Sequence, residues 1–289
     1  MRRLLRALAP LTVIGLAGCG GAAQSVINSS PIAVRQAVTS ASASTAPSAS
    51  PSPVVVDATS VANELSGVEQ AIRVAGVPQA QFVYLGQREQ QLLHLLEAHP
   101  EWVATSLNNL PASIRPAIQA DLTAAQQIGT LNGVSASLPH WKIIAPPAPD
   151  VLLSYYQEAQ QAYGVPWPYL AAINLIETNM GRIQGLSSAG AQGPMQFMPS
   201  TWAYWGRGDV NNPHDAIMAA GRYLQGHGAP SDMTRAVYAY NPSMLYVRAV
   251  QLYAQQMTAE PNTFLAYYNW QVYVPTPSGN TLLPEGFSN

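Results

Sequence analysis

Apolar side chains recur at intervals of three and four positions through residues 61–135, which places them on one face of an α-helix. The spaced positions of two such runs are Leu92, Leu95, Leu96 and His99, followed by Ile114, Ile118, Leu122 and Ala125. Pro116 is expected to break the second run, and Gly129 to close it. No stretch here alternates in the manner of a strand. This pattern therefore predicts that residues 61–135 form a small helical domain of unknown role.

Three residues of the first run, His94, Glu97 and His99, raise the question of a metal site. Their spacing differs from the H-E-x-x-H pattern, and no further cluster of ligand residues follows them. We therefore predict a structural role for these residues, no bound metal and no cofactor.

The next segment, residues 136–149, is rich in proline and predicts an extended linker. Predicted helices and loops then alternate through residues 150–260. The expected helices cover residues 150–164, 165–179, 211–228 and 243–257, and the first is stopped by Gly164. Residues 261–289 form a tail whose alternating pattern around a Pro-Ser-Gly-Asn turn favours a short β-hairpin.

The third of these helices begins with a capping pattern. Asn212 stands at the N-cap, Pro213 at the first helical position and Asp215 three residues after the cap. Asp209, Asn211 and Asp215 also offer oxygen ligands for calcium, but the capping role accounts for this pattern without a metal.

The N-terminus has the features of an export signal. A positive segment with Arg2, Arg3 and Arg6 precedes an apolar run that is too short to span a bilayer. The run ends in LAGC, which resembles a bacterial lipobox with cleavage before Cys19 and lipidation of its thiol. An ordinary signal peptide that contains a cysteine is the alternative. Residues 1–19 are thus predicted to be a lipoprotein signal peptide, and Cys19, the only cysteine, a membrane attachment.

Residues 20–60 consist largely of Ala, Ser, Thr, Pro and Val, a composition that buries too little apolar area to fold. We predict a disordered tether that lets an attached domain reach material just outside a membrane, which in a bacterium is cell wall. The predicted location is the cell envelope, on the outer face of the plasma membrane or the periplasmic side of an outer membrane. The net charge of −2 gives no support for nucleic-acid binding.

One acidic residue stands out in the predicted helix 165–179. Glu177 lies four and seven positions after Ile173 and Leu170, so the three share one helix face. A carboxyl group on an apolar face is poorly solvated, which raises its pKa and suits a general acid. Periodicity alone leaves open the alternative that Glu177 points into water at the helix end.

The glycine-containing segment that follows holds no Asp or Glu between Thr178 and Gly208. Ordinary glycosidases use two carboxylates, and this region offers one. A serine nucleophile is also disfavoured, because GLSSAG around Ser187 is not G-x-S-x-G and no predicted strand precedes it. Thirteen of the fourteen tyrosines lie from Tyr155 onward, where aromatic side chains serve either as core or as the lining of a sugar groove.

Four ordered blocks carry a family resemblance: IETNMG around Glu177, SSAGAQGPMQFMPSTW, NPHDAIMAAGRYL and AYN. Together they resemble the soluble lytic transglycosylases of the lysozyme-like superfamily, which are related to goose-type lysozymes. The layout from lipobox to tail is most similar to actinobacterial lipoproteins of this type. The resemblance implies a mainly α protein in which residues 150–260 are a lysozyme-like helical catalytic domain.

The resemblance also implies roles for individual residues. Glu177 matches the family's single catalytic acid, which cleaves the bond between N-acetylmuramic acid and N-acetylglucosamine in peptidoglycan and leaves 1,6-anhydro ends. The residues that match groove positions are Thr178, Ser187, Met195, Gln196, Tyr240 and Asn241. Tyr240 is expected to hydrogen-bond Glu177 or the substrate's acetamide. The sequence departs from the family pattern at Thr178, Pro194 and Pro242, which puts details of the groove in doubt more than the chemistry.

Two other functions stay open at this point. A muramidase would release reducing ends if a distant carboxylate such as Asp209 or Asp232 positioned a water molecule. A wall-binding lipoprotein without activity would bind glycan and leave it uncleaved, although the retained Glu177 counts against it.

Overall fold

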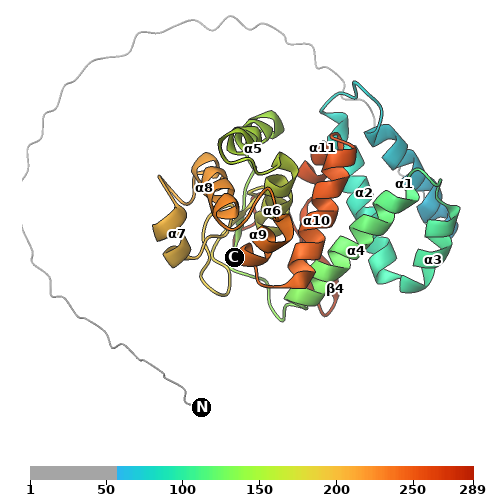
Figure 1. Ribbon diagram of the computed structural model, residues 1–289. Helices are drawn as coiled ribbons and strands as arrows, with labels where there is room; N and C mark the ends of the chain where they lie inside the picture. The colour runs from blue at the N-terminus through green and yellow to red at the C-terminus, as the bar shows by residue number, and fades with distance from the viewer. Residues whose placement is uncertain (1–56) are drawn as a thin grey trace, which may run out of the picture. The chain divides into compact units, whose positions relative to one another are not determined.

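The computed structural model describes residues 57–289, and the predicted signal peptide, Cys19 and the tether up to residue 56 lie outside this part. The described chain is mainly helical, as predicted (Figure 1). Its helices are α1 (Ala58–Ile72), α2 (Gln81–Ala98), α3 (Pro100–Asn109), α4 (Arg115–Asn132), α5 (Pro149–Tyr163), α6 (Trp167–Thr178), α7 (Pro199–Trp205), α8 (Pro213–Gly226), α9 (Met233–Tyr240), α10 (Met244–Ala259) and α11 (Thr263–Tyr268). No helix among residues 57–289 is long and apolar enough to cross a membrane.

The helix termini follow from local sequence signals, with three corrections. Asp57 caps α1 together with Ser60, so this helix begins inside the predicted tether. Pro116 lies in the first turn of α4, where its missing N–H costs nothing, and therefore does not break the helix. The same helix runs through Gly129 and ends before Gly133, whose φ of 68° reverses the chain. The predicted cap of α8 is confirmed, because Asn212 accepts bonds from the amides of residues 214 and 215.

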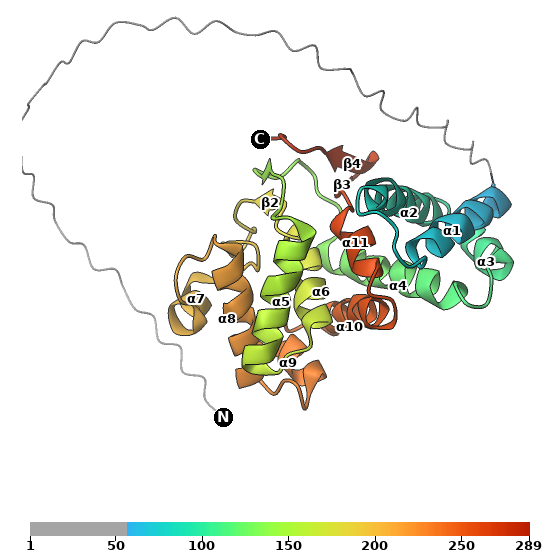
Figure 2. The same cartoon turned by 90° about the horizontal axis from the view of Figure 1, so that it is seen from above.

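Helices α1–α4 share one hydrophobic core with the helices that follow residue 149. Helix α10 lies between α4 and α6 in Figure 1, lies beside both in Figure 2, and packs against each of them. Helix α2 meets α11 closely, since a Cβ atom on Gly86 would lie 2.2 Å from the carbonyl oxygen of Ala266. The helical region before the linker is therefore packed directly on the region that contains Glu177.

Two short antiparallel sheets complete the fold. Strands β3 (Val272–Thr276) and β4 (Gly279–Leu283) form the predicted hairpin, with Val272 opposite Leu283. Strand β1 (Lys142–Ile143) pairs with β2 (Ile183–Gln184), so the linker contacts the segment just after α6. The carbonyl of Phe287 accepts a bond from the Ile143 amide at 2.9 Å. The C-terminal tail thus secures the linker, which in turn secures the start of the loop that follows Glu177.

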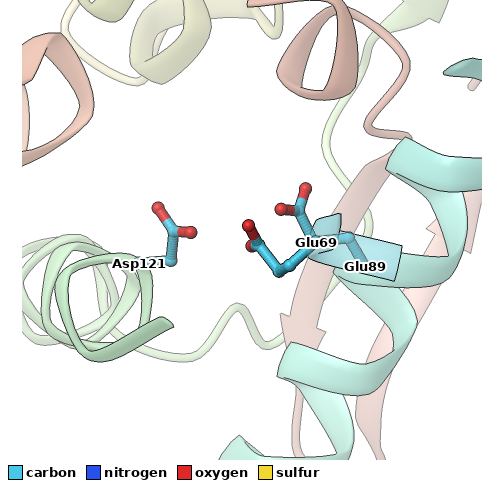
Figure 3. A group of neighbouring side chains, drawn as sticks. All are labelled: Glu69, Glu89 and Asp121. Carbon is cyan, nitrogen blue, oxygen red and sulfur yellow. The ribbon is translucent and has the colours of Figure 1, made fainter. Parts of the chain in front are cut away.

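A group of three buried carboxyl groups lies where α1, α2 and α4 meet: Glu69, Glu89 and Asp121 (Figure 3). One oxygen of each lies within 4.8 Å of the others, and each residue is at most 3% exposed. Arg73 forms an ion pair with Glu69. This spacing suits the oxygen ligands of a hard cation. One guanidinium facing three carboxyl groups also leaves an excess of negative charge that bound protons neutralise.

Two side chains from the C-terminal region donate hydrogen bonds to this group. Tyr267 donates to Asp121, and the indole Nε1 of Trp270 donates to Glu89 at 2.9 Å. Burial raises the pKa of Glu89 from 4.5 to about 7. Burial and the neighbouring charge of Glu89 hold the pKa of Asp121 well above its ordinary value. The bonds from Tyr267 and Trp270 therefore join this group of carboxyl side chains, which lies on α1, α2 and α4, to the α11 region.

The free energy of unfolding is expected to fall as the pH rises from about 4.5 through about 7. The native state keeps protons on Glu89 and Asp121 that the unfolded chain releases at lower pH, so rising pH favours unfolding. Each retained proton contributes a slope of at most about 1.4 kcal/mol per pH unit. Urea unfolding at pH 5, 6, 7 and 8 measures this slope.

In Glu89→Gln the side-chain oxygen still accepts the hydrogen bond from Trp270. The variant should lose the part of the pH slope of the unfolding free energy that the Glu89 proton contributes. Glu101→Gln removes a carboxyl group that is 65% exposed and serves as the matched control. A Glu89→Gln variant with the full wild-type slope would show that this group does not hold the proton.

Candidate active site

Glu177 lies in the last turn of α6, a helix that runs through the core. Leu170 and Ile173, on the same face, are fully buried, so they pack in the core rather than line a groove. The side chain of Glu177 is half-buried at the end of this apolar stripe. The carboxyl group is therefore partly shielded from water but still accessible, as a group that contacts a ligand must be.

The hydroxyl of Tyr246, from α10, donates a hydrogen bond of 2.6 Å to Oε1 of Glu177. Burial raises the pKa of Glu177 from 4.5 to about 7, and the Tyr246 bond opposes part of that rise because it favours the carboxylate. The group is therefore divided between its acid and base forms near neutral pH, which suits proton transfer in both directions.

The chain turns sharply after Glu177. Asn179, Met180 and Gly181 all have positive φ, at 51°, 62° and 87°. Positive φ is unfavourable for the two non-glycine residues, Asn179 and Met180. Such backbone strain persists only where contacts with neighbouring residues impose it. Here the hydroxyl of Thr178 accepts a bond from the Gly181 amide at 3.1 Å. The turn directs the following loop back beside the acid.

A buried polar network ties that loop to α6. Thr178 donates to the carbonyl of Pro194 at 2.5 Å, and the amide of Asn174 donates to the same oxygen at 2.8 Å. Tyr156, from α5, donates to Asn174 at 2.6 Å. Thr178 is fully buried, and its hydroxyl holds the loop in place. Its contact with substrate stays a prediction.

The loop itself is closely fitted to its surroundings. Gly193 has a φ of 71°, and a Cβ atom there would lie 1.9 Å from the carbonyl oxygen of Val210. Residues Gln192 and Phe197 bridge the loop through paired backbone bonds of 2.9 Å. The side chain of Ser187 accepts a bond from the Ala191 amide at 2.9 Å. The close approach of the Val210 carbonyl oxygen leaves no room for a side chain at Gly193.

Two predicted groove residues take different roles in the structure. Met195 is fully buried, so its side chain supports the loop from within, and its contact with substrate stays a prediction. Tyr240 donates to the carbonyl of Met195 at 2.6 Å, and the tyrosine that donates to Glu177 is Tyr246. A bond from Tyr240 to the substrate's acetamide stays a prediction. Burial and the charge of Glu177 raise the pKa of the Tyr240 hydroxyl well above its ordinary value.

The remaining predicted residues border the acid's surroundings. Gln196 and Ser187 are half-buried in the loop, and Gln196 donates to the Gly193 carbonyl at 2.9 Å. Asn241 follows α9, is half-buried, and has no side-chain hydrogen bond among the described residues. Its amide is thus available to a ligand, but whether Gln196, Ser187 or Asn241 contacts substrate stays a prediction.

Sequence reasoning missed Tyr246. Its position in the run SMLYVRAV is indistinguishable from a core tyrosine, because the ring is 2% exposed and follows the apolar face of α10. Only the packing of α10 against α6 brings its hydroxyl to Glu177, 69 positions earlier. No local pattern would have identified it.

Comparisons with known proteins found similarity in sequence. Residues 154–261 match the family model of the transglycosylase SLT domain. A 124-residue stretch is 31% identical to the membrane-bound lytic murein transglycosylase F of Thiobacillus denitrificans (strain ATCC 25259 / T1), over 40% of this chain and 26% of that protein. The chain thus spans about a quarter of the length of this curated relative. No solved structure matched the chain.

Proposed function

We propose that this chain, whose residues 154–261 belong to the transglycosylase SLT family, is a peptidoglycan lytic transglycosylase with Glu177 as its acid and base. The observation that carries the proposal is the half-buried Glu177 with a pKa of about 7 beside Tyr246. A carboxyl group with this pKa is able to donate a proton and then to accept one at neutral pH.

In the first step Glu177 gives its proton to the oxygen that bridges N-acetylmuramic acid and N-acetylglucosamine. The bond from this oxygen to the anomeric carbon breaks, and the substrate's acetamide oxygen bonds to that carbon. In the second step the Glu177 carboxylate takes the proton of the C6 hydroxyl. The C6 oxygen then bonds to the anomeric carbon and releases the acetamide, so a 1,6-anhydro ring forms and Glu177 is again protonated.

The surroundings of other acids support a mechanism with one carboxylate. Asp232 caps α9 by accepting the Arg235 amide at 2.9 Å, and it is exposed. Asp209 is also exposed and accepts the Asn211 amide at 2.9 Å. Both acids suggested for a hydrolytic alternative thus have local roles at a helix end and a turn. No hydrogen bond joins Glu177 to a second carboxyl group within residues 57–289.

We also propose that the protein is attached to a membrane in the cell envelope through a lipid on Cys19. The LAGC motif and the Ala/Ser/Pro-rich segment after it support this arrangement. Labelling cells with an alkyne fatty acid tests it: the wild-type chain should carry the label in the membrane fraction, and Cys19→Ser should not.

Mass spectrometry of the fragments released from purified peptidoglycan tests the activity. We expect muropeptides that end in 1,6-anhydro-N-acetylmuramic acid, which are lighter than hydrolysed ends by one water molecule. Hydrated ends would establish a muramidase instead. Binding without any released fragment would establish the wall-binding alternative.

A further inference from the structure

Helix α7 carries large side chains but has no buried residue. Tyr204, near its end, is 80% exposed, the highest exposure of any large hydrophobic residue in the part of the chain that the structure describes. The next residue, Trp205, is half-buried. Helix α7 lies beside α8 in both views (Figures 1 and 2). A single exposed apolar residue is common on protein surfaces, whereas neighbouring exposed aromatic residues that form one patch are typical of binding sites.

The Trp205 ring is held in place by α8. A Cβ atom on Gly226 would lie 2.3 Å from this ring, so the indole packs directly against the helix backbone. Arg222 donates a hydrogen bond to the Trp205 carbonyl. The ring centroids of Tyr223 and His227 lie 5.5 and 5.4 Å away. Because these contacts fix the indole, a ligand that packs on it does not have to restrict its motion.

His227 adds a polar group to this cluster. Its ring stacks on that of Tyr223 with centroids 4.1 Å apart, and its Nδ1 lies 2.7 Å from the Tyr223 carbonyl oxygen. A carbonyl oxygen only accepts, so Nδ1 carries a hydrogen and Nε2 is left as an acceptor. No described residue forms a hydrogen bond with this Nε2.

The cluster is continuous with the candidate active site. Tyr223 contacts Tyr240 in an edge-to-face pair with centroids 5.5 Å apart. Tyr240 in turn donates a hydrogen bond of 2.6 Å to the Met195 carbonyl, in the loop that Thr178, the residue after Glu177, holds through the Pro194 carbonyl. At the outer end, Tyr204 contacts Trp205 with centroids 5.1 Å apart. A line of ring contacts therefore leads from Tyr240, beside this loop, to the exposed edge of α7.

We propose that Tyr204, Trp205 and His227, here called the aromatic platform, form a binding site for sugar rings of the glycan strand away from the bond that is cleaved. This inference rests on the proposed function. Pyranose rings present apolar C–H faces that pack on aromatic rings, and hydroxyl groups that donate to an acceptor such as Nε2. The three side chains are aromatic and include no acid, so they carry no negative charge that would repel the lactyl carboxylate of N-acetylmuramic acid. A strand that spans both sites would be held more tightly than a short fragment.

The test compares full-chain Tyr204→Ala and Tyr204→Phe with wild type. The ratio of kcat/KM for long, peptide-free glycan strands to kcat/KM for a tetrasaccharide fragment is measured for each. We expect this ratio to fall about three- to tenfold in Tyr204→Ala, as the loss of one aromatic contact implies, and to be retained in Tyr204→Phe. Tyr84→Ala, which removes a tyrosine that is 54% exposed on α2, is the matched control. Thermal unfolding checks that all variants fold.

The outcomes separate the two proposals. If wild type cleaves strands but Tyr204→Ala has an unchanged ratio, the aromatic platform is overturned and the proposed function stands. An equal fall in Tyr84→Ala would also overturn the platform, because the effect would not be specific to α7. If wild type neither binds nor cleaves peptidoglycan, the proposed function fails and this inference fails with it. A platform that captures a protein instead would leave the ratio unchanged.

Discussion

Glu177→Gln is expected to lower turnover of purified peptidoglycan about 10²–10⁴-fold, the range typical of losing a general acid–base group. Glutamine has nearly the same shape and still accepts the hydrogen bond from Tyr246, so the fold and glycan binding should be retained. Glutamine has no carboxylic acid proton to donate, so the oxygen that bridges the two sugars would have to leave without being protonated. Quantified release of soluble muropeptides measures turnover, and pelleting with insoluble peptidoglycan measures binding.

The matched control for this variant is Glu158→Gln, which removes a carboxyl group that is 54% exposed and pairs with His214 on the surface. Its turnover should stay within twofold of wild type, roughly the effect expected of a surface substitution. Wild-type turnover should also decline as the pH rises through about 7, because the protonated form of Glu177 is lost. Undiminished turnover in Glu177→Gln would remove the central claim of the proposed function.

The second large effect is expected for Gly193→Ala. The new methyl group would lie 1.9 Å from the Val210 carbonyl oxygen, and the φ of 71° is strained for alanine. Left-handed strain and overpacking together predict a loss of about 2–4 kcal/mol in the free energy of unfolding. The loop is also expected to move from its place beside Glu177, so turnover should fall as well. Urea unfolding and the muropeptide assay measure the two effects.

Gly190→Ala separates strain from steric contact. Gly190 belongs to the same loop and has a φ of 85°, but nothing lies within 4 Å of its Cβ position. We expect a loss of about 1–2 kcal/mol there, from backbone strain alone. Equal losses in the two variants would show that the contact with Val210 contributes nothing.

The helical class and the approximate limits of most helices followed from the sequence, because they depend on local contacts. The spacing of apolar residues, the Asn212 cap and the Gly164 stop act over a few positions and do not require the rest of the chain. The predictions at Pro116 and Gly129 were wrong because each residue type occurs in two different positions relative to a helix. Proline both opens and breaks helices, and glycine is tolerated within a helix as well as after one.

Glu177 was also singled out from the sequence, since it follows an apolar helix face and precedes a segment without acids, and its proposed role as the acid came from the family resemblance. The environment of Glu177 was not predicted. The hydroxyl that contacts Glu177 comes from Tyr246, and the network beneath it joins Thr178 to Pro194. The sequence analysis expected Tyr240 to bond either Glu177 or the substrate's acetamide, and it did not identify Tyr246 or the bond from Thr178 to Pro194. Both contacts depend on the directions of side chains, which are set by how α6, α10 and the loop pack.

The sequence by itself determined that this chain forms helices, carries one acid at the end of an apolar stripe, and follows it with a glycine-containing loop. Only the tertiary structure decided which tyrosine contacts that acid, which loop residues are buried, and that α1–α4 share a core with the helices around the site. The physical reason is the separation along the chain over which each interaction acts. Periodicity and capping act between near neighbours in the chain, whereas the pKa of Glu177 and the conformation at Gly193 depend on residues brought together from distant positions by packing.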